Sequence, residues 1–443
     1  MTHALALRVA TRLRAAACRL PARLALLGAV LALASCQPKN TSVAPDGRKV
    51  VRLFILFLSQ TQVDYYAWAE KTFEERNPGI DVVIEQFPGT SLKDFEIKLR
   101  LRFASRQEPD LMMANENVIA PLAGLGLLDE APPNLVQRVE TNSLNDMIRR
   151  ACYTDGRCYG VPTDAVWQAM YYNKAQFREA GLDPERPPKT WDELLDVAER
   201  LTVRGPDGVP TRAGFSLRKT GFKAGTAEKW FTFLFSAGGQ PFSDDGTAAT
   251  LDTPEARAAL GFYRAVLDRK IDDVRLSGDQ AGFGQGSVAM FFREIQVNRW
   301  MKETHPEVDF GVARLPSGRG DSTSVSSGGV YLMSVARGSP NRAEAWRFID
   351  FLTDDEAYAR YVAIGGTLPV MRSVAESPAV QADSVMRVFL SQPAQSAGHF
   401  PMVQRAADAI GAYLERFVYG RMTEQELVTR MQRDVSAILE ANR

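Results

Sequence analysis

Apolar and amphipathic segments alternate between residues 50 and 114 in an order that strongly restricts the fold. Three short apolar runs have the length of strands buried on both faces, and two longer segments with helical spacing separate them. The first helix is expected to end at Asn77-Pro78-Gly79. This order predicts a parallel sheet whose carboxyl edge can hold a ligand. The expected strands are 50–58, 80–87 and 110–114, and the expected helices are 64–76 and 91–105.

A second unit of strands and helices follows after residue 158. Its expected strands are 170–173, 287–292, 310–313 and 325–335. Its expected helices are 191–202, 227–237, 254–269, 342–353, 402–419 and 423–440. The chain therefore predicts an α/β fold with two lobes. Each lobe is expected to hold a mostly parallel sheet flanked by helices, and the chain is expected to cross between the lobes more than once.

The first 35 residues have the charge order of an export signal. Five arginines stand there without an acid, and an apolar run at 24–34 follows that is too short to cross a bilayer. The run ends in Leu-Ala-Ser-Cys at residues 33–36, which is typical of a bacterial lipoprotein signal. We expect a signal peptide at 1–35, lipidation of Cys36 and a tether at 36–49. An ordinary cysteine after an ordinary signal is the alternative.

Charge and hydropathy restrict the partners and the location of the chain. Removal of the signal changes the balance of 53 basic and 53 acidic residues to a net charge of about −5, whereas nucleic-acid binding requires a basic surface. No second long apolar stretch follows, so the N-terminal lipid would be the membrane anchor. The expected location is outside the cytoplasm, facing the periplasm or the cell exterior.

Two cysteines remain after the signal, and they bracket a turn. Cys152 and Cys158 enclose Tyr-Thr-Asp-Gly-Arg, and a three-residue loop at 154–156 would place the two side chains opposite each other in a hairpin. That arrangement, in an oxidising location, predicts a disulfide between Cys152 and Cys158.

Motifs for catalysis, metals and cofactors do not stand out in the sequence. His305 and His399 are far apart and lack metal-ligand spacing, and no phosphate-binding loop, dinucleotide fingerprint or nucleophile elbow is present. We expect no catalytic residue, no metal and no cofactor. Pairs of acids are common along the chain, so a glycosidase or lyase with two carboxylates stays open as an alternative.

Several segments, in order over nearly the whole mature chain, resemble the carbohydrate-type extracellular solute-binding proteins of ABC importers, the relatives of maltose-binding protein. The segments are FEERNPGIDV at 73–82, EPDL at 108–111, YGVP at 159–162, MYYNK at 170–174, KTWDEL at 189–194, GSVAM at 286–290, GG at 328–329, AWRFIDFLT at 345–353 and GTLP at 366–369.

This resemblance implies a two-lobe periplasmic-binding-protein fold of type II, joined by a hinge that the chain crosses several times. It places the N-lobe at 50–165 with 328–372 and the C-lobe at 166–327 with 373–443. It also implies a small ligand, most simply a sugar, held between the lobes of a monomer, and an ABC permease with its ATPase as partners. A ligand sensor for a membrane receptor and a carbohydrate-active enzyme are the alternatives.

The resemblance also indicates candidate ligand contacts at the strand ends and lobe crossings. Sugar sites combine aromatic faces with amide, carboxylate and guanidinium groups. The candidates are Gln60 and Thr61 after the first strand, Asn115 and Glu116 after the third, Asp164 and Trp167 past the YGVP turn, Trp230, Arg293 and Glu294, Ser327, Gly328 and Gly329 at the second crossing, and Arg372.

Some of these residues have a second interpretation. Trp230 stands among phenylalanines in an expected helix and suits a core, Arg293 and Glu294 suit a salt bridge with each other, and the paired glycines suit a turn. Glu294-Ile295-Gln296, preceded by Arg293, also stands where the family commonly has a Gly-x-Trp whose indole lies under the sugar. We therefore expect a more polar or charged cleft, and an acidic or phosphorylated sugar is among the ligands that Arg293 would fit.

Overall fold

The computed structural model describes residues 42–56, 59–89, 92–219, 223–243, 245–276, 278–320, 323–398 and 402–441. The predicted signal peptide, the lipidation site Cys36 and the first residues of the tether lie outside these ranges. Within them, no helix is both long enough and apolar enough to cross a membrane.

The first five elements confirm the predicted alternation of strands and helices. They are β1 (Lys49–Ile55), α3 (Gln60–Arg76), β2 (Ile80–Gln86), α4 (Leu92–Ala104) and β3 (Leu111–Asn115). Strand β1 pairs in parallel with both β2 and β3, as predicted. Helix α3 begins earlier than the expected residue 64 because the Ser59 side chain accepts a hydrogen bond from the Gln62 backbone N–H and caps the helix there.

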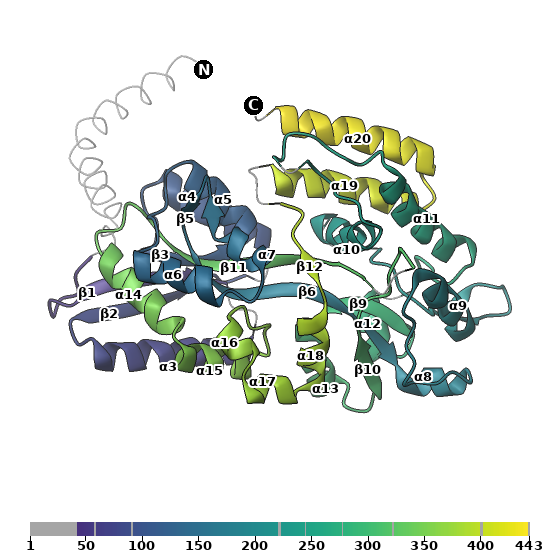
Figure 1. Cartoon of the computed structure of the whole chain (residues 1–443), viewed down its shortest axis with the longest axis horizontal. Coiled ribbons are helices and arrows are strands. Elements are labelled where there is room, and N and C mark those ends of the chain that lie inside the picture. The colour runs from purple at the N-terminus through teal and green to yellow at the C-terminus, as the bar shows by residue number, and fades with distance from the viewer. Residues whose placement is uncertain are drawn as a thin grey trace, which may run out of the picture.

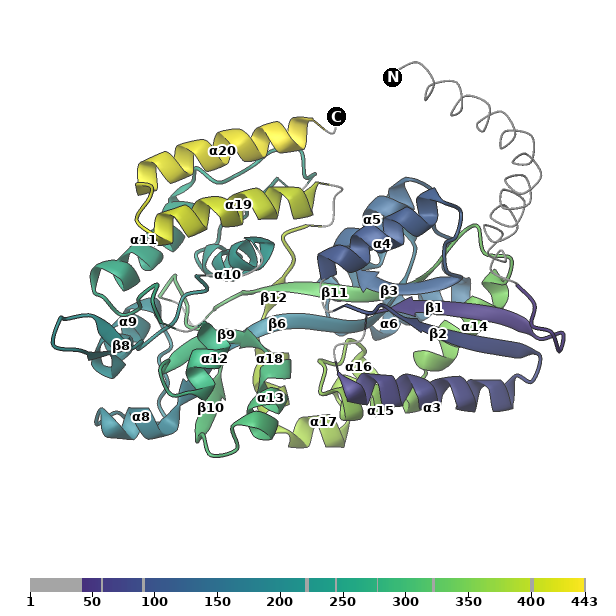
Figure 2. The same cartoon turned by 180° about the vertical axis from the view of Figure 1, so that it is seen from behind.

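Two long strands carry the sheet from one lobe into the other. Strand β6 (Val161–Asn173) pairs with β11 (Ser326–Val335) over residues 161–167, and over the rest of its length it pairs with β9 (Met290–Glu294) and β10 (Phe310–Ala313). The sheet order is β10-β6-β11-β3-β1-β2, with β9 beside β6 and β12 (Ala394–Gln395) beside β11. Figures 1 and 2 show β6 and β11 running through the middle of the molecule.

The mixed direction of this sheet corrects one expectation. A mostly parallel sheet was predicted for each lobe, but β9 and β10 both run antiparallel to β6. The sequence also predicted only residues 170–173 of β6 as a strand. Pro162, Asp164 and Gln168 lower the strand propensity of the preceding segment, and pairing with β11 overrides that preference.

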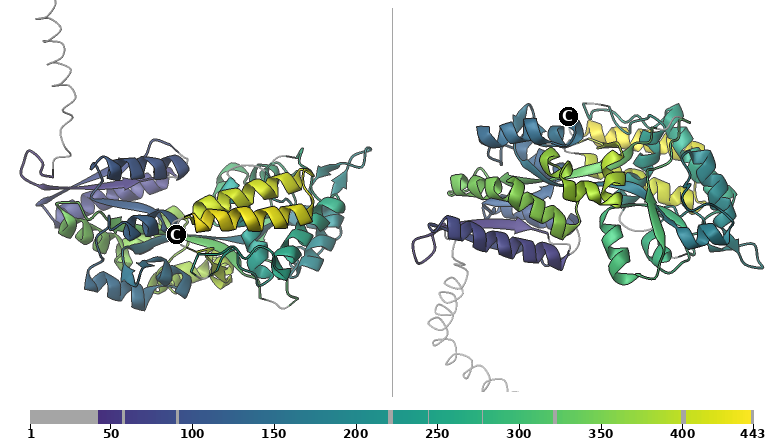
Figure 3. Two further views of the ribbon diagram at one scale, coloured as in Figure 1. Left: turned by 90° about the horizontal axis from the view of Figure 1, so that it is seen from above. Right: turned by 60° about the horizontal axis from the view of Figure 1, so that its bottom comes forward.

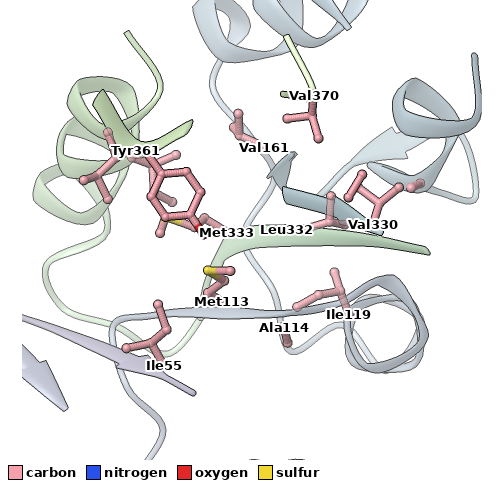
Figure 4. Close-up of a cluster of buried hydrophobic side chains, with 14 of the residues drawn as sticks. Ile55, Met113, Ala114, Ile119, Val161, Val330, Leu332, Met333, Tyr361 and Val370 are labelled. Carbon is pink, nitrogen blue, oxygen red and sulfur yellow. The ribbon is translucent and has the colours of Figure 1, made fainter. Parts of the chain in front are cut away.

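The N-terminal lobe is built around β1, β2 and β3, with helices on both faces of the sheet (Figure 1). Helices α3 and α15 (Asp355–Gly365) cover one face, and α4 and α5 (Glu116–Gly124) cover the other. The core closes around the β3–β11 pair, where Met113 lies opposite Met333 and Ala114 lies opposite Leu332. Figure 4 shows these side chains together with Ile119 from α5. Burial on both faces explains the near-continuous apolar runs of these strands.

The C-terminal lobe is mainly helical around β9 and β10. Helix α10 (Lys223–Ser236) is buried along most of its length, and α19 (Val403–Val418) crosses it closely. A Cβ atom added at Gly411 would lie 1.8 Å from the carbonyl oxygen of Lys223, so the close crossing requires glycine. Helix α20 (Glu424–Glu440) lies beside α19, as the view from above in Figure 3 shows.

The remaining elements are short or lie at the periphery. In the N-terminal part they are α6 (Pro133–Asn142), α7 (Asp146–Ala151), β4 (Tyr153–Thr154) and β5 (Arg157–Cys158). Further along they are α8 (Lys174–Glu179), α9 (Trp191–Leu201), β7 (Val203–Arg204), β8 (Pro210–Arg212), α11 (Pro254–Asp268), α12 (Asp279–Gly284), α13 (Gln296–Thr304), α14 (Arg342–Leu352), α16 (Arg372–Ala375), α17 (Pro378–Ala382) and α18 (Ser384–Ser391).

The hairpin between the two cysteines differs from the prediction. Its loop has two residues rather than three, because Asp155 and Gly156 both have positive φ, as a tight hairpin turn requires. Tyr153, and not Cys152, therefore lies opposite Cys158. Both cysteines are buried free thiols, so the predicted disulfide is not formed in the structure.

Candidate functional site

A pocket of about 140 Å³ lies between the lobes, at the strands that cross from one to the other. Strands β6 and β11 and the segment after β12 contribute Val166, Trp167, Gln168, Ser327, Gly328, Gly329, Tyr331, Ser396 and Ala397. The N-terminal lobe adds Glu96, Asn115 and Asn117, and the C-terminal lobe adds Glu228, Phe231, Glu294, Val403, Gln404 and Ala407. Each lobe thus supplies side chains to one small space that has both polar and apolar lining residues.

The start of α5 presents amide groups to this pocket. Asn115 caps the helix, and its Oδ1 accepts a hydrogen bond of 3.0 Å from the Asn117 backbone N–H. The amide nitrogen of Asn115 lies against Gly329, where an added Cβ would approach it to 3.1 Å. A side chain at this position would thus crowd the Asn115 amide. Gly329 has no positive φ, so the turn interpretation does not apply to it.

Two acceptor oxygens in the lining have no partner among the described residues. They are Oδ1 of Asn117 and Oε1 of Gln168, and both atoms are buried. Gln168 is only 2% exposed. A buried amide oxygen without a hydrogen bond costs about 1–3 kcal/mol, so these atoms favour a ligand or water that donates to them.

Glu116 was predicted as a ligand contact, but in the structure its carboxylate is hydrogen-bonded to other parts of the protein. It is buried, accepts a 2.6 Å hydrogen bond from the Val330 backbone N–H, and accepts another of 2.6 Å from the Ser396 hydroxyl. Desolvation raises its pKa to about 7, although both hydrogen bonds oppose the rise. Glu116 thus joins α5 to β11 and to the segment after β12, beside the pocket rather than in its lining.

Arg293 and Glu294 form a salt bridge, which confirms the second interpretation of this pair. The guanidinium Nε lies 3.0 Å from a Glu294 carboxylate oxygen, and its other nitrogens contact Asp279 and Gln280. Lys229 also pairs with Glu294. Two cations hold the pKa of Glu294 well below its usual range even though burial raises it. Glu294 lines the pocket and Arg293 does not.

Both tryptophans proposed as contacts are core residues. Trp167 borders the pocket, but it is 1% exposed and its indole N–H donates a 2.8 Å hydrogen bond to the Phe389 carbonyl oxygen. Its ring is therefore covered and does not offer a face for stacking. Trp230 is fully buried in the C-terminal core, as its second interpretation held. The neighbouring Phe231 lines the pocket instead.

Four further candidates lie away from the lining. Gln60 bonds Asp64 within α3, and Thr61 accepts a 3.1 Å hydrogen bond from Arg299 of α13. Arg372 is exposed at the start of α16, where its guanidinium donates a hydrogen bond of 3.4 Å to the Ser143 carbonyl oxygen. Asp164 is buried in β6, and desolvation raises its pKa to about 8. None of the four lines the pocket.

Five of the lining residues that sequence reasoning missed come from two helices of the C-terminal lobe. Glu228 and Phe231 lie on one face of α10, and Val403, Gln404 and Ala407 lie on one face of α19. The three- and four-residue spacing places each group on a common face. That spacing was visible in the sequence, but it does not tell which helix face borders a cleft.

No group of three or more potential metal ligands occurs in the described part of the chain. A model of the bacterial extracellular solute-binding proteins matches residues 59–359. This chain belongs to that family. As an extracellular solute-binding protein it is exported, in agreement with the charge order of its N-terminus.

Individual relatives of this solute-binding protein are binding proteins too. A binding protein of Brucella abortus (strain 2308) is 27% identical over 335 residues, which cover 74% of this chain and 77% of that protein. The maltotriose-binding protein of Pyrococcus abyssi is 26% identical over 322 residues, which cover 70% of this chain and 64% of that one.

A solved structure confirms the fold of this solute-binding protein. The cyclic α-maltosyl-1,6-maltose binding protein of Arthrobacter globiformis superposes with a TM-score of 0.77 at 22% identity, over 89% of this chain and all of that one. The likeness confirms the predicted two-lobe α/β fold.

Proposed function

We propose that this solute-binding protein captures a carbohydrate outside the cytoplasm and delivers it to an ABC permease and its ATPase. The observation that carries the proposal is the pocket at the crossing strands, which both lobes line with hydrogen-bond acceptors. A carbohydrate offers many hydroxyl donors in a small volume and so suits such a pocket. The maltotriose-binding and maltosyl-maltose-binding relatives support the same ligand class.

The lobes are proposed to close on the ligand about the crossing strands. We assign residues 50–165 and 328–372 to one lobe and 166–327 and 373–443 to the other. Hinge closure makes a two-lobe protein more compact. X-ray scattering of the mature protein should therefore give a smaller radius of gyration when a bound carbohydrate is added. An unchanged radius at saturation would contradict closure.

The N-terminus is proposed to hold the protein on a membrane through lipid on Cys36. The Leu-Ala-Ser-Cys end of the apolar run supports this assignment. Cys36→Ala should release the protein from the membrane fraction or block its processing, whereas Cys158→Ala, which leaves the lipid site intact, should not. Retention of the Cys36→Ala variant on membranes at mature size would refute lipidation.

A thermal-shift screen with a carbohydrate library tests the ligand class. A ligand that binds only the folded state at 100 times its Kd adds about 2.7 kcal/mol to the free energy of unfolding. Asn117→Ala should reduce the shift because it removes an open acceptor, whereas Asn134→Ala on the exposed surface of α6 should not. A library without a hit would contradict carbohydrate capture.

The protein is proposed to bind its ligand without converting it. Its family and relatives are binding proteins, which supports this assignment. Chromatography of the carbohydrate after hours with the protein should return it unchanged. Appearance of a product would favour the enzyme instead.

A further inference from the structure

The interlobe pocket is lined by carboxylates and contains no basic side chain among its described lining residues. Glu96, Glu228 and Glu294 contribute the carboxylates. Two lining atoms without a hydrogen-bond partner among the described residues, Oδ1 of Asn117 and Oε1 of Gln168, are acceptors as well. A ligand that fills this space must therefore be rich in hydrogen-bond donors, and a negative charge on it would be repelled.

Three basic groups act on the acids of the pocket from outside its lining, and two of them, Lys229 and Arg293, already pair with acids. Lys229 is buried and pairs with Glu294. Arg293 contacts Glu294, Asp279 and Gln280, so its hydrogen-bonding groups point to the protein and not into the pocket. These two cations balance Glu294, whereas Arg218 attracts Glu228 without forming a salt bridge to it among the described residues.

Glu228 forms no ion pair with any residue in the described ranges, although it is exposed to the cleft. Desolvation by the surrounding walls raises its pKa to about 7, in spite of the attraction of Lys229 and Arg218. Repulsion from Glu294 and Asp408 acts in the same direction as desolvation. A neutral sugar would replace the water at this carboxylate with hydroxyl donors, whereas a cation would also compensate its charge.

We propose that the ligand is an amino sugar, whose positively charged amino group binds Glu228 of α10. This inference rests on the proposed function and narrows its ligand class. A protonated amine carries up to three N–H donors and a positive charge, and the Glu228 carboxylate can accept from the donors and compensate the charge. The same lining disfavours the acidic or phosphorylated sugars that Arg293 alone had suggested.

A matched series of disaccharides tests this inference. The glucosamine dimer, its N-acetylated form and cellobiose share their linkage and ring configuration, and they differ at carbon 2 of each ring. Isothermal titration of the mature protein at pH 7 should give at least tenfold tighter binding for the glucosamine dimer than for either neutral form. Glu228→Gln should reduce this preference to less than threefold. Glu356→Gln, an exposed position on α15 outside the pocket, should keep it.

The outcomes separate this inference from the proposed function. Equal or tighter binding of cellobiose or the N-acetylated dimer would overturn the amino-sugar assignment and leave carbohydrate capture intact. The same holds if none of the three binds while another neutral or acidic sugar from the library does. Failure of every carbohydrate, charged or neutral, would overturn both. An unchanged preference in Glu228→Gln, with unfolding like that of the wild type, would remove Glu228 from the site.

Discussion

Asp164→Asn should change how the stability of this protein depends on pH. Asp164 lies on β6 opposite Tyr331, is 5% exposed and has one carboxylate oxygen without a partner. Desolvation raises its pKa from 3.8 to about 8, and a hydrogen bond with the Ala165 backbone opposes the rise. At neutral pH the folded protein thus keeps a proton that the unfolded chain has lost.

The sign and size of the effect follow from this difference in proton binding. Between pH 4 and pH 8 the folded state binds the extra proton, so the free energy of unfolding falls as pH rises, by about 1.4 kcal/mol per pH unit. Over three units this amounts to about 4 kcal/mol. Asparagine does not titrate, so the variant should lose about 4 kcal/mol less than the wild type between pH 4.5 and pH 7.5.

Urea unfolding of the ligand-free protein at these two pH values measures the effect. Glu116 and Glu228, whose pKa values are also raised to about 7, titrate in the same range but cancel because both proteins contain them. The exposed Asp192→Asn should differ from the wild type by less than about 1 kcal/mol at either pH. Equal pH dependence of the wild type and Asp164→Asn would refute the assignment of a buried, protonated Asp164.

Three further predictions concern packing and the thiols. Gly411→Ala should prevent folding or destabilise the protein severely, because the added Cβ would overlap the backbone of α10. Gly261→Ala, on the open side of α11, should instead stabilise the protein by about 1 kcal/mol. Thermal unfolding followed by circular dichroism distinguishes the two variants. Trp167→Ala should lower the free energy of unfolding of the ligand-free protein by about 3–5 kcal/mol, and a change below about 1 kcal/mol would show that this indole lines the cleft instead. Alkylation of the denatured protein without reductant should label both Cys152 and Cys158, and protection of both would restore the disulfide.

The sequence predicted the N-terminal half of the fold well because its signals are local. Apolar runs, the Asn77-Pro78-Gly79 stop and helical spacing mark β1 through β3 to within a few residues. The direction of β9 and β10 is set by distant pairing with β6, which no local pattern encodes. The length of β6 is likewise set by β11, since Pro162 and Asp164 alone would argue against a strand.

The site was predicted only in part, for a related reason. Asn115, Ser327, Gly328 and Gly329 were found because the resemblance marks strand ends and crossings. On β6, Trp167 was predicted to stack on the ligand because of its size. Its neighbour Gln168, whose Oε1 has no hydrogen-bond partner among the described residues, was not predicted. Successive side chains of a strand point to opposite faces, and the sequence does not state which face is the core.

The central claim is that a carbohydrate is held, unconverted, between the lobes at the crossing strands. Isothermal titration of the best carbohydrate from the screen, into the wild type and into Gln168→Ala, tests it most directly. The account predicts one ligand per chain and about fivefold to tenfold weaker binding in Gln168→Ala, the effect of about one lost hydrogen bond. Gln137→Ala, on the exposed face of α6, should bind like the wild type. Equal affinity of Gln168→Ala and the wild type, or conversion of the carbohydrate during the titration, would contradict the account.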